Sequence, residues 1–168
     1  MTSEAIAETA TASAIMPPPG EFTVATRFGA INGHWDDAFE MPQGPLGFAK
    51  HRRFALLQIP NPKLAQFRLM QSLEDADLSF IVMPCPLEEG PIMADDLRDA
   101  ANAAGMTAEN LCLYVIVTVR TLGEAIELTG NLRAPVLLDP HRHVARQVVL
   151  ANAAYAIRAP IGAAKSTA

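Results

Sequence analysis

Two histidines and a carboxylate come closest to a metal-binding cluster in this sequence. His141 and His143 flank Arg142, and Asp139 stands two residues before the first histidine. Two imidazoles and a carboxylate can bind zinc, but zinc sites take three or four protein ligands, usually nitrogen or sulfur, and no third such ligand stands nearby. We therefore interpret the segment as a turn between two strands, and we expect no metal and no cofactor.

The two cysteines, Cys85 and Cys112, favour neither a disulfide framework nor nucleophilic catalysis. Both have apolar neighbours in the sequence, and burial raises the pKa of a thiol and lowers its reactivity. We expect two buried free thiols in a reducing compartment. The chain also lacks a glycine-rich phosphate loop, a His-Glu-x-x-His pair and a Gly-x-Ser-x-Gly turn, so we expect that it is not an enzyme.

An acidic cluster of Glu74, Asp75 and Asp77 separates two predicted strands, residues 67–73 and 78–83. A four-residue connection suits a β-hairpin, and Asp side chains readily accept hydrogen bonds from backbone N–H groups in turns. The cluster is either a solvated hairpin tip or a docking site for a basic surface. The local sequence does not choose between these two interpretations.

Composition limits the kinds of partner. The chain has 168 residues, half of them hydrophobic, with a formal net charge of -5. That length and composition predict one folded domain. Sequence-independent binding of nucleic acid depends on Lys and Arg neutralising phosphates, so we expect no direct nucleic-acid partner. An acidic protein is instead compatible with a basic protein partner, which its charge steers toward it.

The N-terminal residues and the longest apolar run indicate where in the cell the protein is expected. The first residues lack the basic region and apolar core of a secretory signal. The longest apolar run, residues 111–119, is too short to cross a bilayer. We therefore expect a cytoplasmic protein with no membrane partner. Its expected organisation is a disordered N-terminal tail (1–20), one domain (21–160) and a flexible C-terminal tail (161–168).

Short runs of apolar and β-branched residues fill the predicted domain. After an opening strand at 22–26, residues 28–33 are expected to form a turn. The further strands are expected at 35–39, 54–59, 67–73, 78–83, 111–120, 132–138 and 145–150. One helix is expected at 95–103, ended by Gly105, with a short capped turn at 107–110, while residues 152–158 fit either a strand or a short helix. The fold class is therefore mainly β, an antiparallel barrel or sandwich with one or two short inserted helices. Without a heptad pattern, we expect a monomer.

A series of short motifs between Phe28 and Arg158 resembles a known family in order and spacing. The motifs are Phe28-Gly29-x-Ile31, Gln43-Gly44-x-Leu46-Gly47-Phe48, the run from Gln71 to Phe80, Thr129-x-Asn131-Leu132-Arg133-Ala134-Pro135, Gln147-Val148-Val149-Leu150, Tyr155 and Arg158. Together they resemble the flagellar assembly factor FliW family. Ala76 stands where members of this family usually have proline, which makes the hairpin tip less rigid and is expected to weaken partner binding.

The resemblance implies a small antiparallel β-barrel-like domain and a partner switch. Proteins of this family bind newly made flagellin in the cytoplasm. When free of flagellin, they bind the RNA-binding translational regulator CsrA, so that flagellin synthesis follows export. The residues expected to contact a partner are Gln71, Ser72, Glu74, Asp75, Asp77, Asn131 and Arg133.

Two other kinds of function stay open, and so does a purely architectural role for several motif residues. The runner-up function is a structural β-domain of a larger complex, and the third is a small hydrolase or metal-dependent enzyme. Asn131 and Gln147 have side chains that can satisfy backbone groups at strand ends. Tyr155 and Arg158 could stack or pair with each other near the end of the domain.

Overall fold

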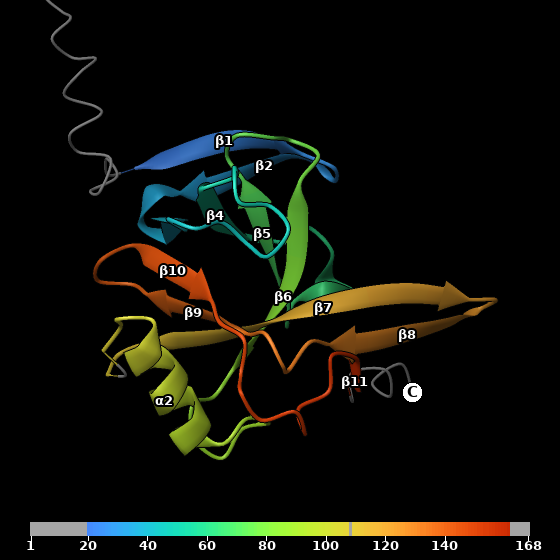
Figure 1. Ribbon diagram of the computed structural model, residues 1–168. Helices are drawn as coiled ribbons and strands as arrows, with labels where there is room; N and C mark the ends of the chain where they lie inside the picture. Colours follow the sequence, from blue (N-terminus) through green and yellow to red (C-terminus); the bar gives the residue numbers. More distant parts are fainter. Residues whose placement is uncertain (1–19, 108, 162–168) are drawn as a thin grey trace, which may run out of the picture.

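A closed ring of strands forms the centre of the computed structural model, which describes residues 20–107 and 109–161. The predicted tails therefore lie almost wholly outside the described residues. The ring runs β7-β6-β5-β4-β3-β10-β9 and closes where β9 pairs with β7. Its strands are β3 (Ala38–Glu40), β4 (Arg53–Gln58), β5 (Arg68–Ser72), β6 (Ser79–Cys85), β7 (Cys112–Leu122), β9 (Val136–Asp139) and β10 (Val144–Gln147). The mainly β, barrel-like fold class is confirmed (Figure 1).

One pair of strands departs from the expected antiparallel arrangement. β10 pairs with β3 in parallel through Val144 and Glu40, whereas the other pairs around the ring are antiparallel. The reason is geometrical. Strand direction alternates around an antiparallel sheet, and a closed ring with an odd number of strands must contain one pair that points the same way. The barrel is therefore mixed, and the strictly antiparallel expectation is wrong at this seam.

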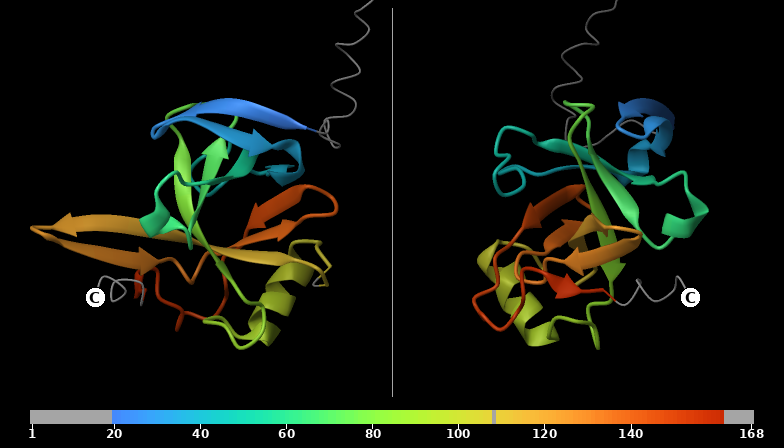
Figure 2. Two further views of the ribbon diagram at one scale, coloured as in Figure 1. Left: turned by 180° about the vertical axis from the view of Figure 1, so that it is seen from behind. Right: turned by 90° about the vertical axis from the view of Figure 1, so that its right-hand side faces the viewer.

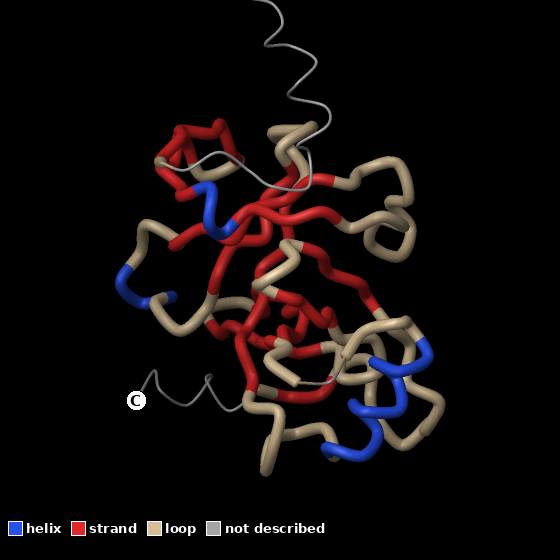
Figure 3. The backbone as a smooth tube through the Cα atoms, turned by 90° about the vertical axis from the view of Figure 1, so that its left-hand side faces the viewer, coloured by secondary structure: helices blue, strands red, loops and turns tan. Residues whose placement is uncertain are grey.

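Apolar side chains fill the barrel and also bind two outer layers to it. The interior receives residues from β3, β4, β5, β6, β9 and β10, namely Phe39, Phe54, Met70, Val82, Val136, Leu138 and Ala145. On one side, the hairpin of β1 (Glu21–Thr26) and β2 (Gly29–His34) covers β4 and β5. On another, α2 (Ala94–Ala103) packs against β7 and β9, at the periphery of the strands in Figure 3. Successive side chains of a strand point to opposite faces of the sheet, so one set fills the barrel interior and the other packs against these outer layers.

The first hairpin turns earlier in the chain than expected. Residues 28–33 were expected to form a turn, but β2 already begins at Gly29 and pairs with β1. Gly29 has a φ of +96°, which favours glycine, and the Thr26 hydroxyl accepts a hydrogen bond from the Phe28 N–H at 2.9 Å. The strand expected at 35–39 is a 3-10 turn, η2 (Trp35–Asp37), followed by β3.

A strand that the sequence patterns did not predict, β8 (Ala125–Gly130), pairs with the second half of β7. The two strands project away from the barrel (Figures 1 and 2), and β11 (Ala159–Pro160) pairs with β8 at its base. The strand expected at 132–138 begins only at Val136, since residues 131–135 form a loop, and the strand expected at 145–150 ends at Gln147. Residues 152–158 are neither strand nor helix.

The expected helix is confirmed as α2, and Gly105 follows it with a φ of +76°. Tyr155 meets this helix and does not pair with Arg158 as one interpretation had suggested. Its hydroxyl donates a hydrogen bond to the Asp96 carboxylate and accepts one from the Met93 N–H at 3.1 Å. A second short 3-10 turn, η3 (Pro62–Leu64), separates β4 from β5. In the described part of the chain, no helix reaches the apolar length that crossing a membrane requires.

Candidate functional site

The predicted hairpin between β5 and β6 is confirmed, and residues 73–78 are called the acidic hairpin below. The Leu78 N–H donates to the Asp75 carbonyl at 3.1 Å, and the Ser72 N–H donates to the Leu78 carbonyl at 3.0 Å. The Asp75 carboxylate accepts a hydrogen bond from the Asp77 N–H at 2.9 Å, the turn-forming bond that Asp was expected to make. The hairpin therefore has a defined backbone.

Two of the predicted contact residues lie beneath the hairpin and not on its surface. Gln71 and Ser72 are 0% and 1% exposed. Nε2 of Gln71 lies 2.9–3.4 Å from the carbonyl oxygens of Ser72, Asp75, Ala76 and Leu78. The Ser72 hydroxyl accepts hydrogen bonds from the N–H groups of Glu74 and Asp75, both at 3.0 Å. These two side chains hold the shape of the hairpin, and as they stand they offer no surface to a partner.

Glu74 is also engaged within the protein. Its Oε1 accepts hydrogen bonds from the backbone N–H groups of Arg52 at 2.8 Å and Arg53 at 3.3 Å. This carboxylate therefore fastens the hairpin to the start of β4, next to the bond from the Leu73 N–H to the Arg53 carbonyl. Asp77 is exposed and Asp75 is half-buried. Glu74 is exposed too, but one of its oxygens is held by these backbone bonds, so its role is at least partly structural.

The loop before β4, residues 41–52, lies beside the acidic hairpin. Gly44 has a φ of +67°, and a Cβ atom there would stand 2.4 Å from the Phe48 carbonyl oxygen, so the loop requires glycine at this position. The turns around it expose Leu46 and Phe48 to 53% and 38%. The Phe48 ring packs edge-on against Phe80 of β6, with centroids 5.4 Å apart. Of these two apolar side chains, Phe48 therefore stands close to the acidic hairpin.

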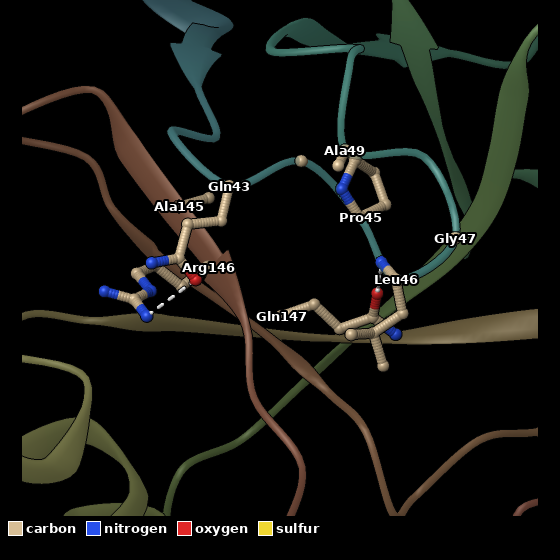
Figure 4. A pocket seen from close by; sticks show the side chains of 9 residues that line it. Gln43, Pro45, Leu46, Gly47, Ala49, Ala145, Arg146 and Gln147 are labelled. Atoms are coloured by element: carbon tan, nitrogen blue, oxygen red, sulfur yellow. Dashed lines mark hydrogen bonds between the residues drawn. The ribbon is translucent and has the colours of Figure 1, made fainter.

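The far end of the same loop is fastened to β10 (Figure 4). Oε1 of Gln147 accepts a hydrogen bond from the Leu46 N–H at 2.8 Å, and its Nε2 donates to the Ala134 carbonyl at 3.0 Å. The Arg146 guanidinium donates to Oε1 of Gln43 at 3.0 Å. Gln43, Leu46, Arg146 and Gln147 line a cavity of about 180 Å³. Gln147 thus satisfies backbone groups, as one interpretation of its motif predicted.

Asn131 and Arg133 belong to the loop between β8 and β9, whereas the acidic hairpin joins β5 to β6. The Asn131 side-chain oxygen accepts hydrogen bonds from the N–H groups of Arg133 and Ala134, both at 3.1 Å, so Asn131 shapes its own loop. Nε of Arg133 is buried with no hydrogen-bond partner among the described residues. The structure therefore does not bring the two groups of predicted contact residues together.

The histidine segment is a turn. The Asp139 carboxylate accepts hydrogen bonds from the N–H groups of His141 at 3.0 Å and Arg142 at 3.2 Å. Nδ1 of His143 lies 2.9 Å from the Ala38 carbonyl oxygen. Within residues 20–107 and 109–161, no three His, Cys, Asp or Glu side chains gather closely enough to hold a metal ion. The arrangement supports the interpretation as a turn between two strands.

Both thiols are free, and both are half-buried, where the sequence had suggested full burial. Burial raises the pKa of Cys85 and of Cys112, and the nearby Asp139 carboxylate raises that of Cys112 further. A raised thiol pKa lowers the fraction of reactive thiolate at neutral pH. Neither cysteine has the environment of a catalytic nucleophile.

Leu46 and Phe48 were quoted as motif residues, but neither they nor the basic residues that follow them were among the expected contact residues. Lys50, Arg52 and Arg53 are exposed next to the acidic hairpin, and a basic run at 50–53 is visible in the sequence. Only the hydrogen bonds of Glu74 reveal that this run lies beside the carboxylates. The protein is therefore a small β-barrel with exposed acidic, basic and apolar side chains on two neighbouring loops, residues 41–52 and 73–78.

Comparisons with known proteins place this barrel in a family. The model of the FliW protein family matches residues 23–161. A flagellar assembly factor FliW of Syntrophus aciditrophicus is 35% identical over 138 residues, covering 79% of this chain and 82% of its relative. Its counterpart from Bdellovibrio bacteriovorus is 34% identical over 137 residues, covering 81% and 76%. A crystal structure of the flagellar assembly factor FliW matches with a TM-score of 0.63 and 29% identity, covering 83% of this chain and 96% of that one.

The chain belongs to the FliW family, and the resemblance drawn from its motifs is confirmed. A relative from Geotalea uraniireducens, 32% identical over 80% of both chains, carries the same description as an assembly factor. The family consists of assembly factors without enzymatic activity, so membership confirms that the protein is not an enzyme.

Proposed function

We propose that this protein is a cytoplasmic flagellar assembly factor that binds flagellin and, when free of it, binds and antagonises a CsrA-type translational regulator. Family membership and the description shared by its relatives as flagellar assembly factors support the first part. The switch between two partners couples the synthesis of flagellin to its export. The protein acts as a monomer and binds no nucleic acid itself.

The observation that carries this proposal is the preorganised acidic hairpin. Gln71, Ser72 and Glu74 hold its backbone through buried or charge-assisted hydrogen bonds. Asp75 and Asp77 are then presented on a backbone that needs little ordering when a partner binds, which lowers the entropic cost of association. CsrA-type regulators bind RNA through basic surfaces, and these two carboxylates complement such a surface.

Calorimetric titration of the protein with flagellin and with the CsrA-type regulator of its own organism, each at two salt concentrations, tests the proposal. We expect both partners to bind, and we expect salt to weaken the regulator complex. The double variant D75N/D77N removes the outward charges but keeps the turn-forming oxygen of residue 75, so it should weaken binding of the regulator and leave the fold intact. Asp99→Asn, an exposed change on α2, is the matched control. Binding to neither partner would refute the proposal.

The second group of predicted contact residues, Asn131 and Arg133, is proposed as a separate contact. Arg133 is half-buried, and a guanidinium that reaches the surface can donate to a carboxylate or carbonyl group of a partner. Arg133→Gln should weaken one of the two complexes in the same titration. If this variant bound both partners with the affinities of the wild-type protein, Arg133 would not be part of the site.

A structural role in a larger complex is the alternative, and one feature favours it. The projecting part of the β7–β8 hairpin exposes Val119, Leu122 and Ile126, each more than 40% exposed. Exposed apolar patches of this kind mark interaction sites. Purification in one assembly of constant stoichiometry would favour the alternative, whereas exchange between two partners would favour the switch.

A further inference from the structure

The outer half of β7 has one edge without a neighbouring strand among the described residues. β6 pairs with β7 only as far as Val117, whereas β8 pairs with β7 from Val117 to Leu122. Residues 118–122 are all exposed, and the hairpin that they form with β8 projects from the barrel (Figure 2). Because an unpaired edge presents backbone N–H and C=O groups, another strand can be added at residues 118–122.

The register of the hairpin determines which backbone groups point toward this edge. A two-residue turn, Gly123-Glu124, connects the strands, so Leu122 and Ala125 form a hydrogen-bonded pair. Such pairs alternate with non-hydrogen-bonded pairs along an antiparallel ladder. Val119 and Thr121 therefore belong to non-hydrogen-bonded pairs, and each directs one donor and one acceptor away from β8, toward the open edge.

A hydrogen bond on the other side of the hairpin supports this assignment. The Ile161 N–H donates to the Leu128 carbonyl at 3.0 Å, so this carbonyl points away from β7, where Leu128 lies opposite Val119. The pair of Val119 and Leu128 is thus one of the non-hydrogen-bonded pairs. The base of the outer edge of β8 is occupied by β11 and Ile161, whereas the β7 edge has no neighbouring strand in the described part of the chain.

The side chains beside the open edge divide into an uncharged face and a charged one. Val119 and Thr121 lie opposite Leu128 and Ile126, and the side chains of directly opposite residues share one face of a sheet. None of these four side chains is charged, and Val119 and Ile126 are 43% and 56% exposed. Arg120 points to the other face, where it lies opposite a glutamate. The first face therefore offers apolar contacts and no charge to a partner.

We infer that the open edge of β7 binds an extended segment of flagellin as an added strand, an inference that rests on the proposed function. The backbone of this segment bonds to Val119 and Thr121, and its alternate side chains lie on the uncharged face beside Val119. The lack of charge on this face selects between the two proposed partners. A regulator recognised by its basic surface gains nothing from it, whereas a segment with apolar side chains at alternate positions does.

Proline substitutions at one pair of opposite residues test the added strand. Thr121→Pro removes an N–H that points to the open edge, so β7 and β8 keep the hydrogen bonds between them. Ile126→Pro makes the same change in the opposite residue, at the outer edge of β8, and Thr121→Ala keeps the N–H. In calorimetric titration with the flagellin of its own organism, Thr121→Pro should bind about tenfold or more weakly. Both control variants should bind nearly as tightly as the wild-type protein, because the added strand lies next to β7 and bonds to its backbone.

Amide hydrogen exchange gives a second readout. The N–H groups of Val119 and Thr121 should exchange more slowly when flagellin is bound, since each gains an acceptor. Thr121→Pro should keep the wild-type affinity for the regulator, and its urea unfolding curve should match that of Ile126→Pro. Unchanged flagellin binding by Thr121→Pro, or exchange at residues 119 and 121 that flagellin does not slow, would overturn the added strand while the proposed function stands. Equal weakening of both partners would overturn the assignment of this edge to flagellin. Failure of the wild-type protein to bind flagellin would overturn both the inference and the proposed function.

Discussion

Oε1 of Glu74 lies 2.8 Å from the backbone nitrogen of Arg52 and accepts its hydrogen bond. A residue that reads as part of an acidic docking cluster therefore connects two loops of its own protein. The bond fastens the acidic hairpin, which carries Asp75 and Asp77, to the start of β4. A variant that removes Glu74 consequently tests the organisation of the surface as well as its charge.

Replacement of Glu74 by alanine should lower the free energy of unfolding by about 1–2 kcal/mol, because hydrogen bonds to a charged acceptor contribute more than neutral ones. Glu74→Gln keeps an oxygen at the same position and should lose less. Urea denaturation of both variants measures the difference. Equal losses would mean that the hydrogen bonds to residues 52 and 53 contribute nothing to stability.

Gln71→Leu should destabilise the protein by at least about 2 kcal/mol. Leucine fills a similar volume but leaves buried carbonyl groups of the hairpin without the donor that Nε2 supplies. Amide hydrogen exchange should accelerate within residues 73–78 before it accelerates in the barrel strands. Gln58→Leu changes an exposed glutamine of β4 and serves as the control. Unchanged exchange in the hairpin would argue against the positioning role of Gln71.

Gly44 and Gly47 permit a matched comparison of backbone strain and steric blockage. Both have positive φ, but a Cβ at Gly47 would meet no atom within 4 Å, whereas one at Gly44 would meet the Phe48 carbonyl oxygen at 2.4 Å. Gly47→Ala should therefore cost about 1–2 kcal/mol, the price of a left-handed backbone for alanine. Gly44→Ala should cost clearly more and weaken binding of the regulator. Similar unfolding midpoints for the two variants would contradict this account.

The contact between Tyr155 and Asp96 predicts a dependence on alkaline pH. The hydrogen bond to Asp96, helped by burial, raises the pKa of Tyr155 above its ordinary value near 10. The folded protein thus favours the protonated phenol. This contribution is fully present below the pKa of the unfolded state and is lost as pH rises through the folded pKa.

Tyr155→Phe should accordingly be less stable than the wild-type protein at pH 7 to 9, with a difference that shrinks above roughly pH 10. Urea unfolding of both proteins at several pH values measures the gap, and other titrating groups cancel in the comparison. A gap that stays constant up to pH 11 would show that the hydroxyl proton is not involved.

Local sequence patterns were sufficient to predict those helices, strands and turns whose formation depends mainly on their own residues. The apolar, β-branched run of residues 111–120 and the alanine-rich helix that Gly105 follows lie almost where they were expected. The hairpin between β5 and β6 was also predictable, because turn chemistry at Asp75 and Asp77 acts over a few residues. The series of strand runs predicted the mainly β fold class, a barrel or a sandwich, and the family motifs added the expectation of a barrel.

Elements that depend on distant partners could not be predicted in the same way. β8 has a weak pattern of its own and exists because it pairs with β7. The parallel seam between β3 and β10 follows only from the closure of a ring, which no local window contains. β2 begins at Gly29 and β9 at Val136, and both starts differ from the expected ones because they depend on which residues pair with a neighbouring strand.

The sequence by itself determined the composition of the surface: an acidic cluster, a basic run and a loop containing two glycines, Leu46 and Phe48. Only the tertiary structure decided how these residues are used. Gln71 and Ser72 are both buried at the end of β5, where their side chains bond the backbone of the hairpin. The Glu74 carboxylate lies at the start of β4 because it accepts hydrogen bonds from two backbone N–H groups there. The hydrogen bonds from the Arg52 and Arg53 N–H groups to Glu74 bring the acidic hairpin beside the basic run at 50–53.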